Sequence, residues 1–174
     1  LNQRATHTPS AQHVLDANYY KRIEAIQFSM THDDGARVED VKEADIILLG
    51  VSRTSKTPTS IYLANRGYKT LNIPLIEGQN IPSFLKEESK NLCVIGLSVE
   101  AERLSEIRHN RLEVMNIKKL RNYSDLDFIQ SEIKSSKKLF KKYNWPIIDV
   151  TRKSVEETAA SIIRIFDIKK KKKK

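Results

Sequence analysis

The chain has 174 residues, of which 39% are hydrophobic and 30% are charged, and it carries a formal net charge of +9. This length suits one domain with a single packed core, and the composition excludes collagen-like, low-complexity and disulfide-rich proteins. Cys93 is the only cysteine, so a reducing, cytoplasmic environment is expected. No apolar run reaches the roughly 18 residues of a membrane span, so we expect no membrane association.

Much of the positive charge lies at the C-terminal end, where residues 169–174 are six consecutive lysines. Like charges in a row repel one another, and we therefore expect a disordered tail there. Because six of the nine net charges belong to this tail, the charge does not indicate a specific nucleic-acid partner. We expect residues 1–168 to form one α/β nucleotide-binding domain, with residues 1–15 loose.

Apolar spacing predicts helices alternating with strands along the chain. Such alternation is typical of an α/β fold with a mostly parallel sheet flanked by helices. Ser154 and Glu157 have the spacing of a capping box at the start of the last helix. In chain order, we expect a helix at 16–30 capped by Asp16, a strand at 44–50, a helix at 57–67, strands at 68–76 and 91–99, helices at 100–116 and at 124–144 capped by Ser124, a strand at 145–151 and a helix at 154–166.

The segment "GVSRTSKT" at residues 50–57 has nearly the spacing of a phosphate-binding P-loop. Gly50, Lys56 and Thr57 take the positions of the first glycine, the lysine and the Mg²⁺-binding hydroxyl. Ser55 replaces a glycine and narrows the conformations open to the backbone. In a P-loop, main-chain amides surround the phosphates while the lysine and the helix N-terminus supply positive charge. The alternative is a plain strand–turn–helix connection with Ser and Thr caps.

Two cations favour the phosphate-binding interpretation. Arg53 and Lys56 both precede or begin the following helix, where the helix dipole disfavours positive charge unless an anion is present. We expect both side chains to stabilise charge during phosphoryl transfer. The predicted nucleotide-binding residues are Gly50, Val51, Ser52, Arg53, Thr54, Ser55, Lys56 and Thr57.

Three aspartates are candidates for proton transfer or metal binding. Asp33 and Asp34 belong to "HDDG" at residues 32–35, where either carboxylate could act as general base or hold a metal. The alternative is a solvated Asp-Gly turn. Asp149 ends an apolar strand, as the Mg²⁺-binding carboxylate of a P-loop protein does, so Thr57 and Asp149 are the predicted metal ligands. A turn before the last helix is the alternative for Asp149.

A basic cluster on the helix at 100–116 has two interpretations. Its members could bind a nucleotide or a phosphoprotein. We favour a solvated helix face on which Glu102, Glu106 and Glu113 offset the charge. The cluster comprises Arg103, Arg108, His109 and Arg111.

Three segments carry a family resemblance: "IEAIQFSMTHDDG", "ADIILLGVSRTSKTPTSIYLANRGYKTLNIPLI" and "WPIIDVTRKSVEETAA". They resemble the regulatory proteins of pyruvate, phosphate dikinase and phosphoenolpyruvate synthase. Such proteins use ADP to phosphorylate, and so inactivate, a threonine beside the catalytic histidine of their target. They reverse this reaction with inorganic phosphate and release pyrophosphate. The resemblance implies ADP as phosphoryl donor, Mg²⁺ as cofactor and residues 50–57 as the nucleotide loop.

The target implied by the resemblance is one of these two enzymes, with the dikinase mildly favoured. Family members have a sizeable region before the "HDDG" segment, whereas only residues 1–31 precede it here. A truncated, non-catalytic module that binds nucleotide or a partner is therefore one alternative. A P-loop kinase of a small molecule is another. The expected oligomeric states include a homodimer.

Overall fold

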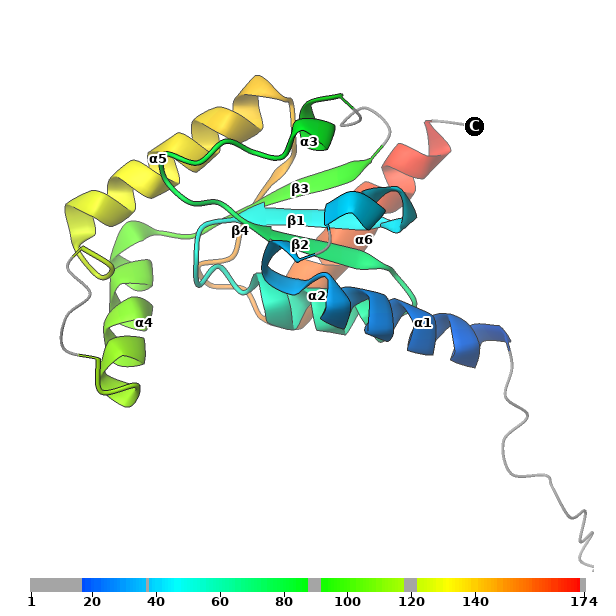
Figure 1. Ribbon diagram of the computed structural model, residues 1–174, viewed down its shortest axis with the longest axis horizontal. Coiled ribbons are helices and arrows are strands. Elements are labelled where there is room, and N and C mark those ends of the chain that lie inside the picture. The colour runs from blue at the N-terminus through cyan, green and yellow to red at the C-terminus, as the bar shows by residue number, and fades with distance from the viewer. Residues whose placement is uncertain (1–16, 37, 88–91, 118–121, 173–174) are drawn as a thin grey trace, which may run out of the picture.

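A four-stranded parallel sheet forms the centre of the computed structural model, which describes residues 17–36, 38–87, 92–117 and 122–172 (Figure 1). All neighbouring strands run parallel, in the order β2-β1-β3-β4. The predicted α/β class with a mostly parallel sheet is confirmed. The strands are β1 at Ile46–Gly50, β2 at Thr70–Pro74, β3 at Cys93–Ser98 and β4 at Ile147–Asp149.

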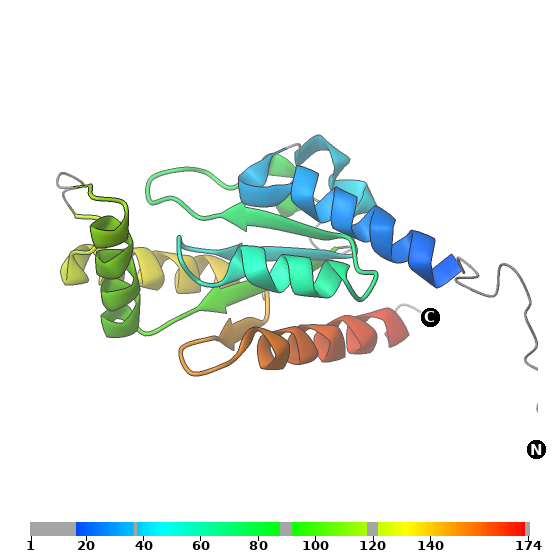
Figure 2. The ribbon, with the colours of Figure 1, turned by 90° about the horizontal axis from the view of Figure 1, so that it is seen from below.

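Helices cover both faces of this sheet. Helices α2 and α6 lie side by side on one face, with α1 packed against α2 and β2 (Figure 2). Helices α3 and α5 lie over the other face, and α4 stands beyond the carboxyl ends of the strands (Figure 1). The helices are α1 at Ala17–Thr31, α2 at Lys56–Ala64, α3 at Ser83–Glu87, α4 at Ala101–Val114, α5 at Leu126–Lys142 and α6 at Val155–Lys171, with short 3₁₀ helices η1 at Asp33–Gly35 and η2 at Val38–Glu43.

The side chains of β1 alternate between two hydrophobic clusters. Ile46 and Leu48 belong to a cluster with α2 and α6, while Ile47 and Leu49 belong to one with α3 and the end of α5. All four side chains are fully buried. This explains why the strand is a continuous apolar run, since a parallel strand covered on both faces has no solvent-facing side.

The C-terminal end differs from the sequence-based expectation. Helix α6 continues to Lys171, so the predicted disordered tail at 169–174 is wrong for its first three residues. Lysines in the last turn of a helix are stabilised by the negative end of its dipole. Lys169 also donates a hydrogen bond from Nζ to the Leu92 carbonyl. Residues 173–174 lie outside the described residues, as do the predicted loose segment 1–15 and the predicted cap Asp16.

Helix caps confirm one prediction and correct another. Ser154 and Glu157 form the predicted capping box at the start of α6. Helix α5 is capped by Asp125, whose carboxylate accepts a hydrogen bond from Phe128 N at 2.9 Å, and not by Ser124. None of the helices in the described ranges is long and apolar enough to cross a membrane.

Gly96 in β3 gives a test of the packing between the sheet and α5. A Cβ atom at this position would lie 2.5 Å from the Phe140 ring. We expect Gly96→Ala to lower the free energy of unfolding by about 1–3 kcal/mol, because the ring must shift within a filled core. Urea unfolding measures this loss. Adding Phe140→Leu should recover part of it, and an unchanged free energy for the single variant would contradict this contact.

Candidate functional site

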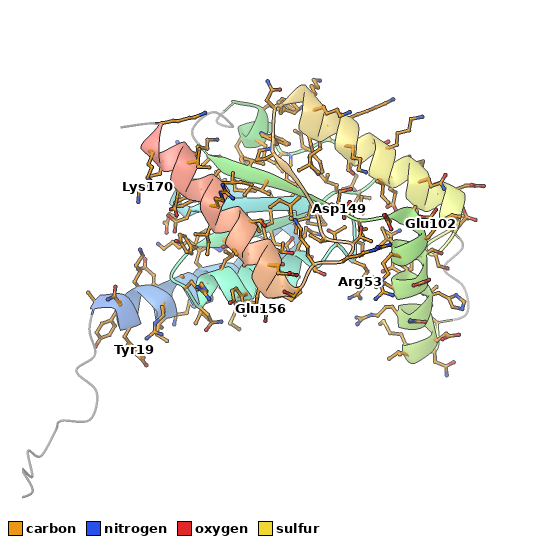
Figure 3. The ribbon with its side chains drawn as sticks, turned by 180° about the vertical axis from the view of Figure 1, so that it is seen from behind. Tyr19, Arg53, Glu102, Asp149, Glu156 and Lys170 are labelled. Atoms are coloured by element: carbon orange, nitrogen blue, oxygen red, sulfur yellow. The ribbon has the colours of Figure 1, made fainter. Side chains whose placement is uncertain are left out.

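The candidate site lies at the carboxyl edge of the sheet, where the ends of the parallel strands meet. The chain passes from β1 to β2 on one side and returns to β3 on the other side of β1. Ligands of open α/β sheets bind at such a switch point. The loop of residues 51–55, between β1 and α2, lies at this point. Arg53 from this loop and Asp149 from β4 both lie at this edge (Figure 3).

The loop has a backbone shape suited to an anion. Arg53 and Ser55 adopt positive φ angles of 72° and 57°. Ser55 therefore takes up the left-handed conformation for which a P-loop uses glycine. Within the described part of the chain, the main-chain amides of Arg53, Ser55, Lys56 and Thr57 have no hydrogen-bond acceptor. Successive free amides beside a helix N-terminus form a concave site for an anion.

Gly50 is needed at the start of this loop for a steric reason. A Cβ atom there would lie 2.6 Å from Thr54 Oγ1 and 2.9 Å from the Leu97 carbonyl oxygen. The Leu97 backbone in β3 cannot retreat as a flexible side chain could. The glycine therefore lets the loop turn back closely over the sheet.

Lys56 is held inside the loop by one of the loop's own carbonyl groups. Its Nζ donates to the Val51 carbonyl at 3.0 Å, and the side chain is 5% exposed. Burial lowers the pKa of Lys56 to about 8; Asp34 and Asp33 oppose this effect, while Arg108 adds to it. Thr54 Oγ1 also donates to the Val51 carbonyl, at 2.9 Å. Lys56 can therefore turn toward an anion without leaving that carbonyl unpaired.

The "HDDG" segment meets the start of α2. Thr57 Oγ1 donates to both carboxylate oxygens of Asp33, each at 3.1 Å. Asn72 Nδ2, from β2, donates to Thr57 Oγ1 at 3.1 Å and to the Asp33 carboxylate. The structure thus brings the predicted Asp33 and Thr57 together. Asp34 is exposed beside them with a φ of 51°.

Sequence reasoning missed Asn72, which is fully buried. The available signal was an amide side chain between the apolar Leu71 and Ile73, since such a side chain needs a polar partner when buried.

Asp33 and Thr57 suit a Mg²⁺ ion bound together with phosphate. Mg²⁺ in such sites takes one or two protein oxygens and completes its octahedron with phosphates and water. The described residues contain no cluster of three or more His, Cys, Asp or Glu side chains that could hold a metal alone. The Asp33 carboxylate and the Thr57 hydroxyl are oxygen ligands that suit Mg²⁺, while the free amides beside them suit the phosphate.

Asp149 is placed differently from the other predicted acids. It ends β4, and β3 lies between β4 and β1. Its Oδ1 accepts hydrogen bonds from Thr151 N at 2.8 Å and Thr151 Oγ1 at 2.6 Å. Burial would raise the pKa of Asp149, but these hydrogen bonds, with Lys137 and Lys153 nearby, lower it overall. Its contacts are those of a turn before α6, and its roles as base and metal ligand stay predictions.

Arg108 corrects the interpretation of the basic cluster on α4. Its side chain is 1% exposed, so the solvated-face prediction is wrong for this residue. The guanidinium donates to the Ser52 carbonyl in the loop at 3.2 Å, to the Tyr123 carbonyl at 3.1 Å and to Glu132 Oε2 at 2.6 Å. The one sequence signal was spacing, because Arg108 follows the buried Leu104 by a single helical turn. The other three members, Arg103, His109 and Arg111, are exposed as predicted.

Tyr123 forms a second link to the loop. Its hydroxyl lies 3.4 Å from Ser52 Oγ. Burial would raise the pKa of Tyr123, but hydrogen bonds with Ser52 and Arg53 and the positive charges of Arg53 and Arg108 lower it overall.

The fold and the loop together define an α/β protein in which the N-terminus of α2 has no side-chain cap. Arg53 and Lys56 lie beside this N-terminus, at the switch point of the sheet. The family described as kinase/pyrophosphorylase matches residues 1–163, and the chain belongs to this family. Three similar proteins are named pyruvate, phosphate dikinase regulatory proteins.

The relative from Pelagibacter ubique is 64% identical over 170 residues, covering 98% of this chain and 62% of the relative. That from Erythrobacter litoralis is 52% identical over 167 residues, covering 96% and 60%. That from Rhizobium meliloti is 52% identical over 156 residues, covering 89% and 57%. The chain thus spans about three-fifths of the length of these curated relatives.

The buried charge of Lys56 predicts an unusual dependence of stability on pH. Its pKa is about 8 in the folded state, against an ordinary value of 10.5. Below pH 8 the folded protein holds a poorly solvated charge, which lowers its stability. As the pH rises from about 8 to 10.5, the folded state loses this proton first, so stability is regained. The difference between these two pKa values corresponds to about 3 kcal/mol in the free energy of unfolding.

We therefore expect Lys56→Met to raise the free energy of unfolding at pH 7 by about 1–3 kcal/mol. The gain should vanish toward pH 10.5, as measured by urea unfolding across this range. Lys134→Met, at an exposed position on α5, is the control and should show no such gain. A destabilised Lys56→Met at pH 7, or an effect independent of pH, would contradict the buried ammonium.

Proposed function

We propose that this chain holds the nucleotide site of a regulatory phosphotransferase. The first reaction transfers the terminal phosphoryl group of ADP to a threonine hydroxyl of pyruvate, phosphate dikinase, releases AMP and inactivates the dikinase. In the second reaction inorganic phosphate takes that phosphoryl group from the threonine, which restores the hydroxyl and releases pyrophosphate. The observation that carries this proposal is the set of free amides at residues 53–57 beside Lys56 and Arg53. The names of the relatives support the choice of target.

A single diphosphate site suffices for both reactions. In the kinase reaction the diphosphate belongs to ADP, and in the phosphate-dependent reaction it is the pyrophosphate that forms. The loop amides and Lys56 bind the phosphate oxygens and stabilise the charge that shifts between them. Lys56 Nζ donates to the Val51 carbonyl in the ligand-free site, and a bound diphosphate would compete for this ammonium and pair with its charge.

The acidic side of the site supplies proton transfer and metal ligands. Asp33 and Thr57 are the residues that would hold Mg²⁺, which supplies charge neutralisation at the transferred phosphoryl group. Asp34 is exposed next to this pair. It is the carboxylate proposed to accept the proton of the threonine hydroxyl as its oxygen bonds to phosphorus.

The nucleoside of ADP has a suitable cavity beside the loop. A hollow of about 440 Å³ opens next to Val51, between the segment 75–81 and α5. This volume lies within the range of small-molecule sites. Apolar side chains suit a base, and amide groups suit its polar edge. The lining includes Leu75, Ile76, Gln79, Asn80, Ile81, Leu139 and Tyr143.

Calorimetry with ADP and with pyrophosphate tests this assignment in two parts. Lys56→Ala should weaken both ligands by about tenfold or more, since it removes a charge-assisted contact to phosphate. Ile81→Trp, which fills the hollow, should weaken ADP by a similar factor and leave pyrophosphate unchanged. Unchanged affinity of Lys56→Ala for both ligands would refute the phosphate site, whereas unchanged ADP affinity of Ile81→Trp would refute only the nucleoside cavity.

Transfer itself is measured with ADP labelled in its terminal phosphate and purified dikinase. Label on a dikinase threonine supports the kinase assignment. Tight ADP binding without transfer would instead support the alternative of a non-catalytic binding module. Label on a small acceptor in place of the dikinase would support a small-molecule kinase.

A further inference from the structure

We propose that Arg108 is a positioning residue for the nucleotide loop: it holds the Ser52 carbonyl inside the protein so that the following amides face the phosphates. This inference rests on the proposed function of the loop. It assigns a role to a side chain on α4 that contacts no substrate itself.

The need for such a residue follows from the geometry of the backbone. A loop that turns its N–H groups outward must turn carbonyl groups inward, and every buried carbonyl needs a donor. The Val51 carbonyl accepts hydrogen bonds from Thr54 Oγ1 and Lys56 Nζ. The Ser52 carbonyl accepts a hydrogen bond from Arg108 Nη2 at 3.2 Å. Without that donor, the Ser52 peptide would be more stable facing water, and the next amides would turn away from the anion.

Arg108 is itself held rigidly in place. Glu132 Oε2 lies 2.6 Å from Nη1, with side chains only 1% and 11% exposed. The Tyr123 carbonyl accepts from the same nitrogen, and the guanidinium carbon lies 4.9 Å from the centre of the Tyr123 ring. A planar guanidinium can serve three acceptors in fixed directions, which an ammonium cannot. The loop is thereby tied to α4, to α5 and to the connection between them.

Arg108 acts on the loop through the direction of its hydrogen bonds more than through its charge, because Glu132 pairs with the guanidinium at 2.6 Å. Removing Arg108 should therefore free the Ser52 peptide, weaken phosphate binding and reduce the response of the loop amides to an anion. A residue that only filled space would change neither the affinity nor the amide response.

The test uses Arg108→Met combined with Glu132→Gln, so that no unpaired carboxylate is left buried. Calorimetry measures pyrophosphate affinity, and ¹H–¹⁵N NMR measures the chemical-shift changes of the amides of residues 53–57 when pyrophosphate is added. We expect affinity to fall by about tenfold and the downfield shifts of these amides to shrink. Arg108→Lys keeps one donor but not the planar fork, so its affinity should fall less. Arg103→Met, on the same helix but exposed, is the control and should change neither.

The outcomes separate this inference from the proposed function. Parent-like affinity and parent-like shifts of the loop amides in the folded double variant would overturn the role of Arg108. If the double variant does not fold, Arg108→Lys decides, and parent-like affinity in that variant overturns the inference. Failure of the parent protein to bind either ADP or pyrophosphate would instead refute the proposed function and with it this inference.

Discussion

The structure of the site depends on two backbone carbonyl groups that point inward. Those of Val51 and Ser52 are satisfied from inside the protein, by Thr54 and Lys56 in one case and by Arg108 in the other. Only because these acceptors are satisfied can the amides that follow remain free at the surface of the loop. A free amide in a loop is otherwise bonded to water or to a neighbouring group, and a row of them is a site for an anion.

This arrangement lowers the stability of the protein without ligand. Lys56 is buried as a cation, and Arg53 and Ser55 hold left-handed conformations that non-glycine residues rarely adopt. Such strain concentrates at functional sites because the surrounding structure enforces it. A bound diphosphate would relieve part of the cost by pairing with the lysine and the amides. The same groups that lower the free energy of unfolding of the ligand-free protein would thus make diphosphate binding favourable.

The sequence predicted the parts of the molecule that depend on local pattern. The strand–loop–helix of residues 46–64, the parallel sheet and the Ser154 capping box follow from apolar spacing and turn chemistry, and all three are present. The meeting of Asp33 with Thr57 lay beyond local pattern, because it depends on where η1 packs against β2. The same holds for Asn72 and Arg108. A long-range contact determines the burial of each. Arg108 lies among glutamates on α4, which by local pattern predicts exposure, and it is buried because α5 packs beside α4.

Chemical shifts of the loop amides during a titration with pyrophosphate test the central claim most directly. In an ¹⁵N-labelled sample, a diphosphate held by the loop should move the amide resonances of residues 53–57 further than any others, with protons shifting downfield as they form hydrogen bonds to anionic oxygens. Shifts confined to exposed lysines, or none at all at saturating pyrophosphate, would contradict a phosphate site at the end of β1.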